Sequence, residues 1–182
     1  MGQTLIMAFY SLIFASIIGL IFGMLSVLKS KVCNVIAQIF VDIIRGVPMI
    51  VLAFFVFFGI PYDKKNFLHS TFTFTALQAG IICLSLNCGA YMSEIIRAGI
   101  QSVDIGQMEA ARSLGIPYWK AMQKVVLPQA IRTMIPSIIN QFIITLKDTS
   151  LISIIGIREL TQNGKILAAN SSTKVMIIWV IV

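Results

Sequence analysis

The stretch Leu5–Leu28, LIMAFYSLIFASIIGLIFGMLSVL, contains no charged side chain. As an α-helix it would be about 36 Å long, enough to cross a hydrocarbon core of about 30 Å with some tilt. A secretory signal peptide fits less well, because its apolar region is shorter and follows a basic stretch. Here Lys29 and Lys31 come after the run. We therefore expect a transmembrane helix over these residues.

The composition of the whole chain agrees with that interpretation. Of the 182 residues, 58% are hydrophobic and only 12% are charged, and the mean hydropathy is +0.92. A soluble domain carries about 25% charged residues, so this chain has too little charge to cover a globular surface in water. In a soluble protein the net charge of +7 would suggest nucleic acid. Here the basic residues cluster between apolar runs, as the positive-inside rule predicts. Composition thus predicts an all-α integral membrane protein and no nucleic-acid partner.

The second apolar run, Val35–Ile60, is interrupted. Asp42 and Arg45 lie in its first half, and Gly-Val-Pro follows at 46–48. Proline removes a backbone donor and pushes the residue before it out of α geometry. We therefore expect a broken helix, in which Asp42 and Arg45 are able to pair at i, i+3.

Three more apolar runs follow. Ala76–Ile96 is the third, and Glu94 near its end is spaced to pair with Arg97. The fourth, 128–146, contains an internal proline. The last run, Val175–Val182, is too short to cross a bilayer. The pattern predicts about five transmembrane helices in a single domain over 1–182, with the last helix apparently truncated.

Gly19 and Gly23 lie four residues apart in the first run. This spacing lets a neighbouring helix approach closely. A flexible span with no partner at that face fits equally well, because glycine is frequent in membrane helices.

The distribution of lysine and arginine predicts the orientation. One side of the membrane would hold Lys29, Lys31, Arg97, Arg112, Lys120, Lys124 and Arg132, and the other Lys64, Lys65, Arg158, Lys165 and Lys174. The first side has more, so the positive-inside rule puts the connection 98–127 in the cytoplasm and the N-terminus outside.

That connection carries helix signals of its own. Asp104 and Gln107 have the spacing of a capping box, which predicts a helix over about 105–114. Gly115 would then end this helix as its C′ residue. The connection is far longer than the usual 4–6 residues or so, which favours a functional role.

A second amphipathic helix is expected over 117–127. Pro117 would occupy its first position, and Pro128 would mark its end. The two helices would form a compact hairpin at the cytoplasmic face. From pattern alone, docking on a partner and resting on the membrane surface fit equally well.

The motif in this hairpin resembles a known one. Glu109-Ala110-Ala111-Arg112-Ser113-Leu114-Gly115, with Leu127-Pro128 behind it, resembles the EAA loop of ABC importer permeases. The resemblance implies that 98–127 couples to a cytoplasmic ATPase by docking into a cleft on it. Glu109 would face the ATPase or cap the local helix, Ala110 and Ala111 would permit close packing, and Gly115 would make the turn.

Three other stretches are similar to the polar amino-acid permease subfamily (histidine, glutamine, arginine or cystine type). They are Phe40–Pro48, which resembles its "FRGTP" segment, Ser85–Arg97 in the third span, and Leu146–Leu151 at the end of the fourth. Ile44 and Val47 depart from the usual aromatic and threonine. The resemblance implies a type I permease fold in a bacterial cytoplasmic membrane.

The same resemblance implies partners and a mechanism. Two permease subunits, identical or paralogous, would sit on two ATPase subunits, and an external solute-binding protein would deliver a polar amino acid. ATP and magnesium would be bound by the ATPase, so no cofactor is expected on this chain. Broken helices would serve as hinges, for which the candidates are Gly46, Pro48, Pro128 and Pro136. A static kink at each proline fits equally well.

Polar residues within the spans are candidates for the substrate pathway. They are Asn87, Asn140, Gln141, Asp148, Thr149 and Ser150. Hydrogen bonds between helices are the favoured alternative for Asn87 and Asn140. A helix N-cap is the alternative for the segment 148–150.

Enzymatic functions are not supported by the residues present. The sequence has no Walker A loop, and its single histidine, His69, excludes an H-E-x-x-H zinc motif. The three cysteines have no C-x-x-C spacing, so no metal site is expected. An ion-coupled secondary carrier, with Glu94 or Asp148 as the coupling carboxylate, is the alternative function. A carrier has no need of the cytoplasmic hairpin.

Overall fold

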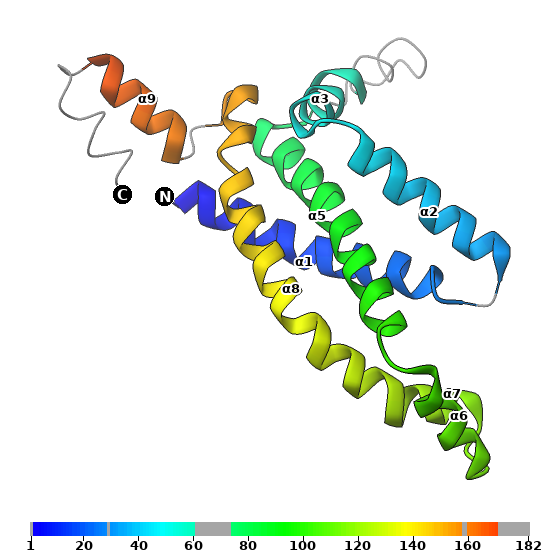
Figure 1. Ribbon diagram of the computed structural model, residues 1–182. Helices are drawn as coiled ribbons and strands as arrows, with labels where there is room; N and C mark the ends of the chain where they lie inside the picture. The colour runs from blue at the N-terminus through cyan, green and yellow to red at the C-terminus, as the bar shows by residue number, and fades with distance from the viewer. Residues whose placement is uncertain (1, 29, 61–73, 158–159, 171–182) are drawn as a thin grey trace.

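The computed structural model describes residues 2–28, 30–60, 74–157 and 160–170, and the regular structure in these ranges is helical (Figure 1). In chain order the elements are α1 (Gly2–Leu25), α2 (Lys31–Gly46), α3 (Met49–Phe54), the π-helix η1 (Phe55–Gly59), α5 (Ala76–Gln101), α6 (Ile105–Ser113), α7 (Tyr118–Ala121), the π-helix η2 (Met122–Val126), α8 (Leu127–Asp148), the 3-10 helix η3 (Leu151–Ile155) and α9 (Leu160–Asn170).

Among the described residues, three helical runs are long and apolar enough to cross a membrane. They are α1, α5 and the run Tyr118–Ile155 that contains α8. A fourth span is formed if α2 is joined with Met49–Gly59. These spans confirm the first four predicted runs. The predicted fifth run, Val175–Val182, lies outside the described residues.

Helix α5 lies at the centre and packs closely against α1 (Figure 1). A Cβ atom added to Gly19 would lie 2.5 Å from the Cβ of Met92, and one added to Gly23 would lie 2.8 Å from the Cβ of Ile96. Real Cβ atoms do not approach so closely, so only glycine allows this helix separation. Of the two interpretations left open for Gly19 and Gly23, the close helix partner is therefore the correct one, and the partner is α5.

The second span is broken where the sequence predicts it. Gly46 ends α2, and Val47 takes an extended conformation with φ −95° and ψ 128°. Pro48 then precedes α3 as its cap residue. The two parts of the span meet at 101°. Proline at this point provides no amide to continue the helix, so the chain turns.

The prediction that Pro128 ends a helix is wrong. The chain remains helical from Tyr118 through Pro128 into α8. Immediately before the proline, the amide of Leu127 donates to the carbonyl of Met122, five residues earlier. This wider π turn gives the proline ring room beside the preceding turn. Helix α8 likewise continues through Pro136.

The hairpin lies beyond the end of α5, at the lower right in Figure 1. Asp104 caps α6 as predicted, but its carboxylate accepts from the amide of Gly106 at 2.6 Å. The predicted capping box is wrong, because the side chain of Gln107 accepts from the Nε2 of Gln129 at 3.3 Å. A contact with α8 thus replaces the local bond.

The turn between the hairpin helices is glycine-dependent, as predicted. Gly115 has φ +80°, in the left-handed region that glycine adopts without strain. Its amide donates to the carbonyl of Arg112 at 2.9 Å, and the amide of Ile116 donates to Ala111 at 3.3 Å. These bonds satisfy carbonyls at the end of α6. Pro117 is the cap of α7 and not its first residue.

Candidate functional site

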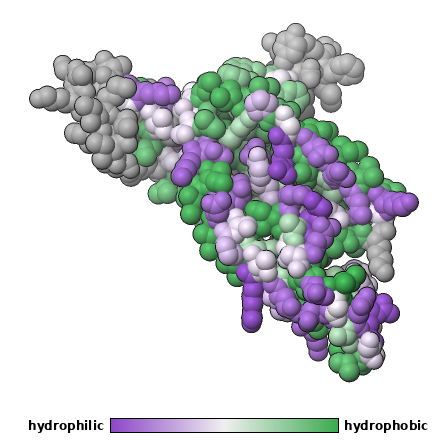
Figure 2. Space-filling model, in the orientation of Figure 1, coloured by the Kyte–Doolittle hydropathy of each residue, from purple (hydrophilic) through white to green (hydrophobic). Residues whose placement is uncertain are grey.

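Polar side chains gather on one stripe of α5. Asn87, Tyr91 and Glu94 follow one another at intervals of four and three residues, so they share a helix face. Helices α2 and α5 form one cavity lined by polar side chains, and α2, α5 and α8 form a second one. Figure 2 shows hydrophilic residues down the middle of this view, with hydrophobic residues on either side.

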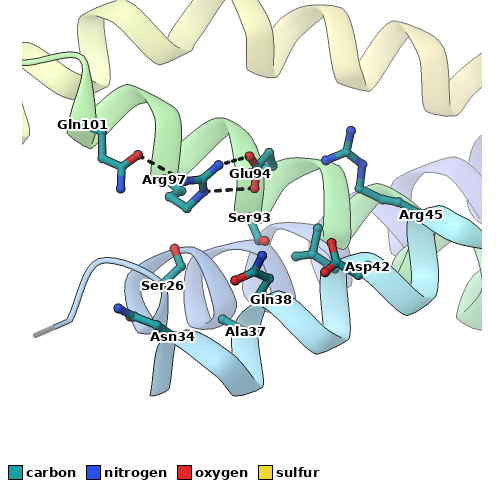
Figure 3. Close-up of a pocket in the computed structure, with 11 residues that line it drawn as sticks. Ser26, Asn34, Ala37, Gln38, Asp42, Arg45, Ser93, Glu94, Arg97 and Gln101 are labelled. Carbon is teal, nitrogen blue, oxygen red and sulfur yellow. Dashed lines mark hydrogen bonds and ion pairs between the residues drawn. The ribbon is translucent and has the colours of Figure 1, made fainter. Parts of the chain in front are cut away.

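The first cavity, here called the α2–α5 cavity, has a volume of about 340 Å³ (Figure 3). On its α5 side, Arg97 forms the predicted ion pair with Glu94, including a bond from its Nε to Oε2 at 3.1 Å. Arg97 also donates to the Oε1 of Gln101 at 3.2 Å. Asp42 and Gln38 line the opposite wall on α2. The cavity therefore has charged groups on both walls.

The predicted pairing of Asp42 with Arg45 is wrong. The Cζ atom of Arg45 lies 4.8 Å from the ring centroid of Tyr91, and Figure 3 shows its side chain directed away from Asp42. No ion pair to Asp42 is found in the described part of the chain. A pair at i, i+3 contributes about 0.2–0.5 kcal/mol, whereas a cation over an exposed ring contributes about 0.5–1 kcal/mol. The contact across helices is thus the stronger one.

The second cavity, here called the break cavity, has a volume of about 460 Å³ and lies at the broken span. Residues 46–48 line it. So do Asn87, Gln141 and Asp148, which come from two different helices. Three of the six predicted pathway residues are therefore brought together here, beside two of the predicted hinge residues.

Arg45 and Tyr91 also line the break cavity, and the list of pathway residues inferred from the sequence omits both. Arg45 borders the α2–α5 cavity as well, so it lines both cavities. Two signals could have identified them. Arg45 immediately precedes the helix break, and Tyr91 shares the α5 face of Asn87 and Glu94.

The other three predicted pathway residues lie elsewhere. Asn140 is exposed on α8, and no described residue accepts from or donates to its side chain or that of Asn87. The hydroxyls of Thr149 and Ser150 donate to the carbonyls of Leu146 and Lys147, at 2.7 Å each. Ser150 does occupy the N-cap position of η3, as the N-cap interpretation of 148–150 requires, but both hydroxyls bond backwards to the end of α8 and cap no amide of η3.

Most residues of the motif 109–115, predicted from the sequence to couple to an ATPase, lie on the surface of the hairpin. Ala111 is buried against the rest of the protein, but Glu109, Ala110 and Arg112 are exposed. Leu114, the C-cap residue of α6, is 82% exposed, and Ile105 at the start of α6 is 74% exposed. Both ends of α6 therefore present a large apolar side chain that is available for contact with a partner.

A model of the family described as binding-protein-dependent transport system inner membrane component matches residues 15–182. This chain belongs to that family. The probable amino-acid permease protein YxeN of Bacillus subtilis (strain 168) is 40% identical, over 92% of this chain and 73% of its own length. The glutamine transport system permease protein GlnP of Escherichia coli (strain K12) is 37% identical, over 85% and 68%.

Solved structures of ABC transporters have the same fold as this chain. A chain from the crystal structure of an amino acid ABC transporter with histidines superposes with a TM-score of 0.87 and 33% identity, covering 99% of this chain and 82% of that one. An inward-facing MetNI methionine ABC transporter gives a TM-score of 0.75 at 22% identity, a likeness of fold alone.

The chain is thus a permease subunit of an ABC importer, with the all-α type I fold. It is a membrane protein that works with an ATPase and a binding protein, and it is not itself the ATPase. Membership in this family favours the ATP-driven importer over the ion-coupled carrier. An importer driven by ATP does not depend on ion coupling, so no such role has to be assigned to the ion pair Glu94–Arg97.

Proposed function

We propose that this permease transports a polar amino acid and that the zwitterion passes through the break cavity. The observation that carries the proposal is that a guanidinium, on Arg45, and a carboxylate, on Asp148, line the same cavity at a helix break. The names of its relatives, which include amino-acid and glutamine permeases, support the same substrate class.

The chemistry of the cavity suits a zwitterion. Arg45 can hold an α-carboxylate through two parallel N–H bonds. Asp148 can accept from an α-ammonium group, and the amides of Asn87 and Gln141 can bond to a polar side chain. Charged residues are costly within a membrane unless they face one another or a water-filled path, and a broken span is where transporters place such groups.

The test uses the full-length permease, reconstituted in vesicles with its ATPase and its binding protein. ATP hydrolysis is recorded as each amino acid is added in turn. We expect stimulation by one or a few polar amino acids and none by apolar ones. Silence across the panel, with the ATPase shown to be bound, would mean that the substrate class is wrong.

We also propose that the hairpin 98–127 is the ATPase-coupling element. The exposure of Glu109 and Leu114 leaves them available to a partner, and the left-handed Gly115 fixes the angle between the hairpin helices. We expect Glu109→Lys and Gly115→Trp each to reduce ATP-driven uptake at least tenfold and to weaken co-purification of the ATPase. Lys165→Gln, an exposed change on α9, is the control. Normal uptake in both hairpin variants would exclude this role.

The proposal also includes the orientation of the chain in the membrane and the number of permease subunits in the transporter. We place the N-terminus outside and the hairpin in the cytoplasm of a bacterial cell, with two permease subunits in each transporter. In a Cys33→Ser background, Gly2→Cys should react with an impermeant maleimide in intact cells. Gln107→Cys should react only after permeabilisation, and the reverse pattern would invert the topology.

The hinge role of Gly46, Pro48, Pro128 and Pro136 belongs to the same proposal. The 101° bend at 47–48 and the π turn before Pro128 are points where the helical hydrogen-bond pattern is already interrupted. Motion there would break few bonds. Transport with Pro48→Ala should fall if the bend moves during the cycle, whereas transport with Pro136→Ala should fall less, because α8 is continuous there.

A further inference from the structure

A third cavity lies away from the polar pathway, where α1 and α5 end and the hairpin begins. We call it the interfacial cavity, and its volume is about 450 Å³. Its wall is mostly apolar and consists of Met24, Val27, Leu28, Ile100 and Met122. A volume of this size is within the range of small-molecule sites, about 300–1,000 Å³. The cavity can therefore hold part of an apolar molecule.

Among the described residues, one cation and no carboxylate line this cavity. The cation is Arg112 of α6, and the hydroxyl-bearing Ser30 at the start of α2 lines the cavity too. In the described part of the chain Arg112 has no ion-pair partner. A guanidinium that faces an apolar cavity without an acid suits an anionic ligand with an apolar body.

The position of the cavity along the membrane normal is set by the ends of the spanning helices. Helix α1 ends at Leu25 and α5 ends at Gln101, next to residues of the cavity wall. Trp119, which also lines it, is 61% exposed and contacts the ring of Tyr118 edge to face, with centroids 5.7 Å apart. Tryptophan and tyrosine are enriched at the level of lipid headgroups.

From these observations we infer that the interfacial cavity binds an anionic glycerophospholipid. Its phosphate bonds to Arg112 and to the hydroxyl of Ser30, and an acyl chain packs along Val27, Leu28 and Ile100. Basic pockets between membrane helices on the cytoplasmic side bind anionic headgroups by the same chemistry. The choice of the cytoplasmic leaflet rests on the orientation proposed above; the cavity and its ligand class do not.

This site would link the lipid to the coupling hairpin. Arg112 lies on α6 and Trp119 on α7, while the opposite apolar wall comes from the end of α1 and the residues just after it, Met24, Val27 and Leu28. A lipid bound there would bridge the hairpin and the first spanning helix. The stability of the hairpin, and with it uptake, would therefore depend on the anionic lipid content of the membrane.

The test titrates the full-length permease, purified with its ATPase in detergent, with phosphatidylglycerol and with phosphatidylcholine of the same acyl chains. Native mass spectrometry counts bound lipid, and the same spectra show whether the ATPase is retained. We expect phosphatidylglycerol to bind at least tenfold more tightly. Arg112→Gln should remove that preference, and Arg112→Lys should restore most of it. Val27→Trp, which fills the cavity, should weaken the binding of phosphatidylglycerol at least tenfold.

Arg132→Gln is the matched control, because Arg132 is exposed on α8 and lies outside this cavity. Equal losses in Arg112→Gln and Arg132→Gln would reduce the effect to general charge attraction and overturn the site. Binding that appears only when the ATPase is absent would assign the cavity to the ATPase instead. ATPase retention without lipid preference would refute the lipid site while leaving the proposed coupling role intact.

Discussion

The two faces of α5 differ in how they pack and therefore in which substitutions they tolerate. Towards α1 the helix packs on glycines, so closely that Gly19 and Met92 leave no room for one added carbon. On its other stripe, Tyr91 and Glu94 border cavities. The first face fixes where the helices stand, and the second leaves polar groups free to contact a solute. Substitutions should therefore affect folding on the first face and transport on the second.

The largest effect is expected at the glycine face. A side chain at Gly19 would meet backbone atoms of Met92 and Ser93 at 3.3 Å, which no rotamer change can relieve. We expect Gly19→Leu to destabilise the permease by about 3 kcal/mol or more, the upper end of overpacking. The thermal unfolding midpoint in detergent and the yield from membranes measure this. Gly2→Leu is the control on the same helix, since nothing lies within 4 Å of Gly2. Equal midpoints for both would contradict the distinction between the two faces.

The next effect is expected at the cavity face. Arg45 is exposed and holds no part of the apolar core, so Arg45→Gln should leave the unfolding midpoint almost unchanged. Uptake should fall about 10–100-fold, because a hydrogen bond to a charged group contributes about 1.5–3 kcal/mol. Arg45→Lys keeps the charge without the two parallel bonds and should give an intermediate rate. Arg132→Gln, a cation outside both polar cavities, is the control; if it impairs uptake as much, Arg45 has no special role.

The smallest effect is expected for the ion pair Glu94–Arg97. Both side chains are at least one third exposed, at 33% and 40%. Exposed ion pairs contribute about 0–1 kcal/mol. A double-mutant cycle of Glu94→Gln and Arg97→Gln on the free energy of unfolding should thus give a coupling energy below about 1 kcal/mol. A coupling of several kcal/mol would show that this face also determines stability, and the contrast with the glycine face would fail.

Single residues in the sequence were sufficient to predict several features of the structure. The broken span follows from Pro48, and the stop of α6 follows from Gly115, because each residue limits its own backbone. The close approach of a helix at Gly19 could be anticipated, but not the identity of the neighbour. Asp104 caps α6 as its residue type predicts. In each of these cases, the cause lies within a few residues of the effect.

For two side chains that had a choice of partner, the prediction from the sequence was wrong. Gln107 bonds to Gln129 on another helix, and Arg45 lies over Tyr91 instead of pairing with Asp42. Both alternatives are close in energy to the local bond, so the distance to a neighbouring helix decides between them. The prediction for Pro128 was also wrong. A proline usually ends a helix, but the π turn before Pro128 lets the helix continue.

By itself, the sequence determined that the chain spans a membrane, where its first four spans lie, that the second span breaks, and which loop carries the motif for which we propose a coupling role. Those features follow from hydropathy, from proline and glycine, and from a contiguous motif. Only the tertiary structure brought Arg45, Asn87 and Asp148 to one cavity, because they come from three helices and no spacing along the chain relates them. Spans are a property of single segments, whereas a cavity is a property of how segments pack.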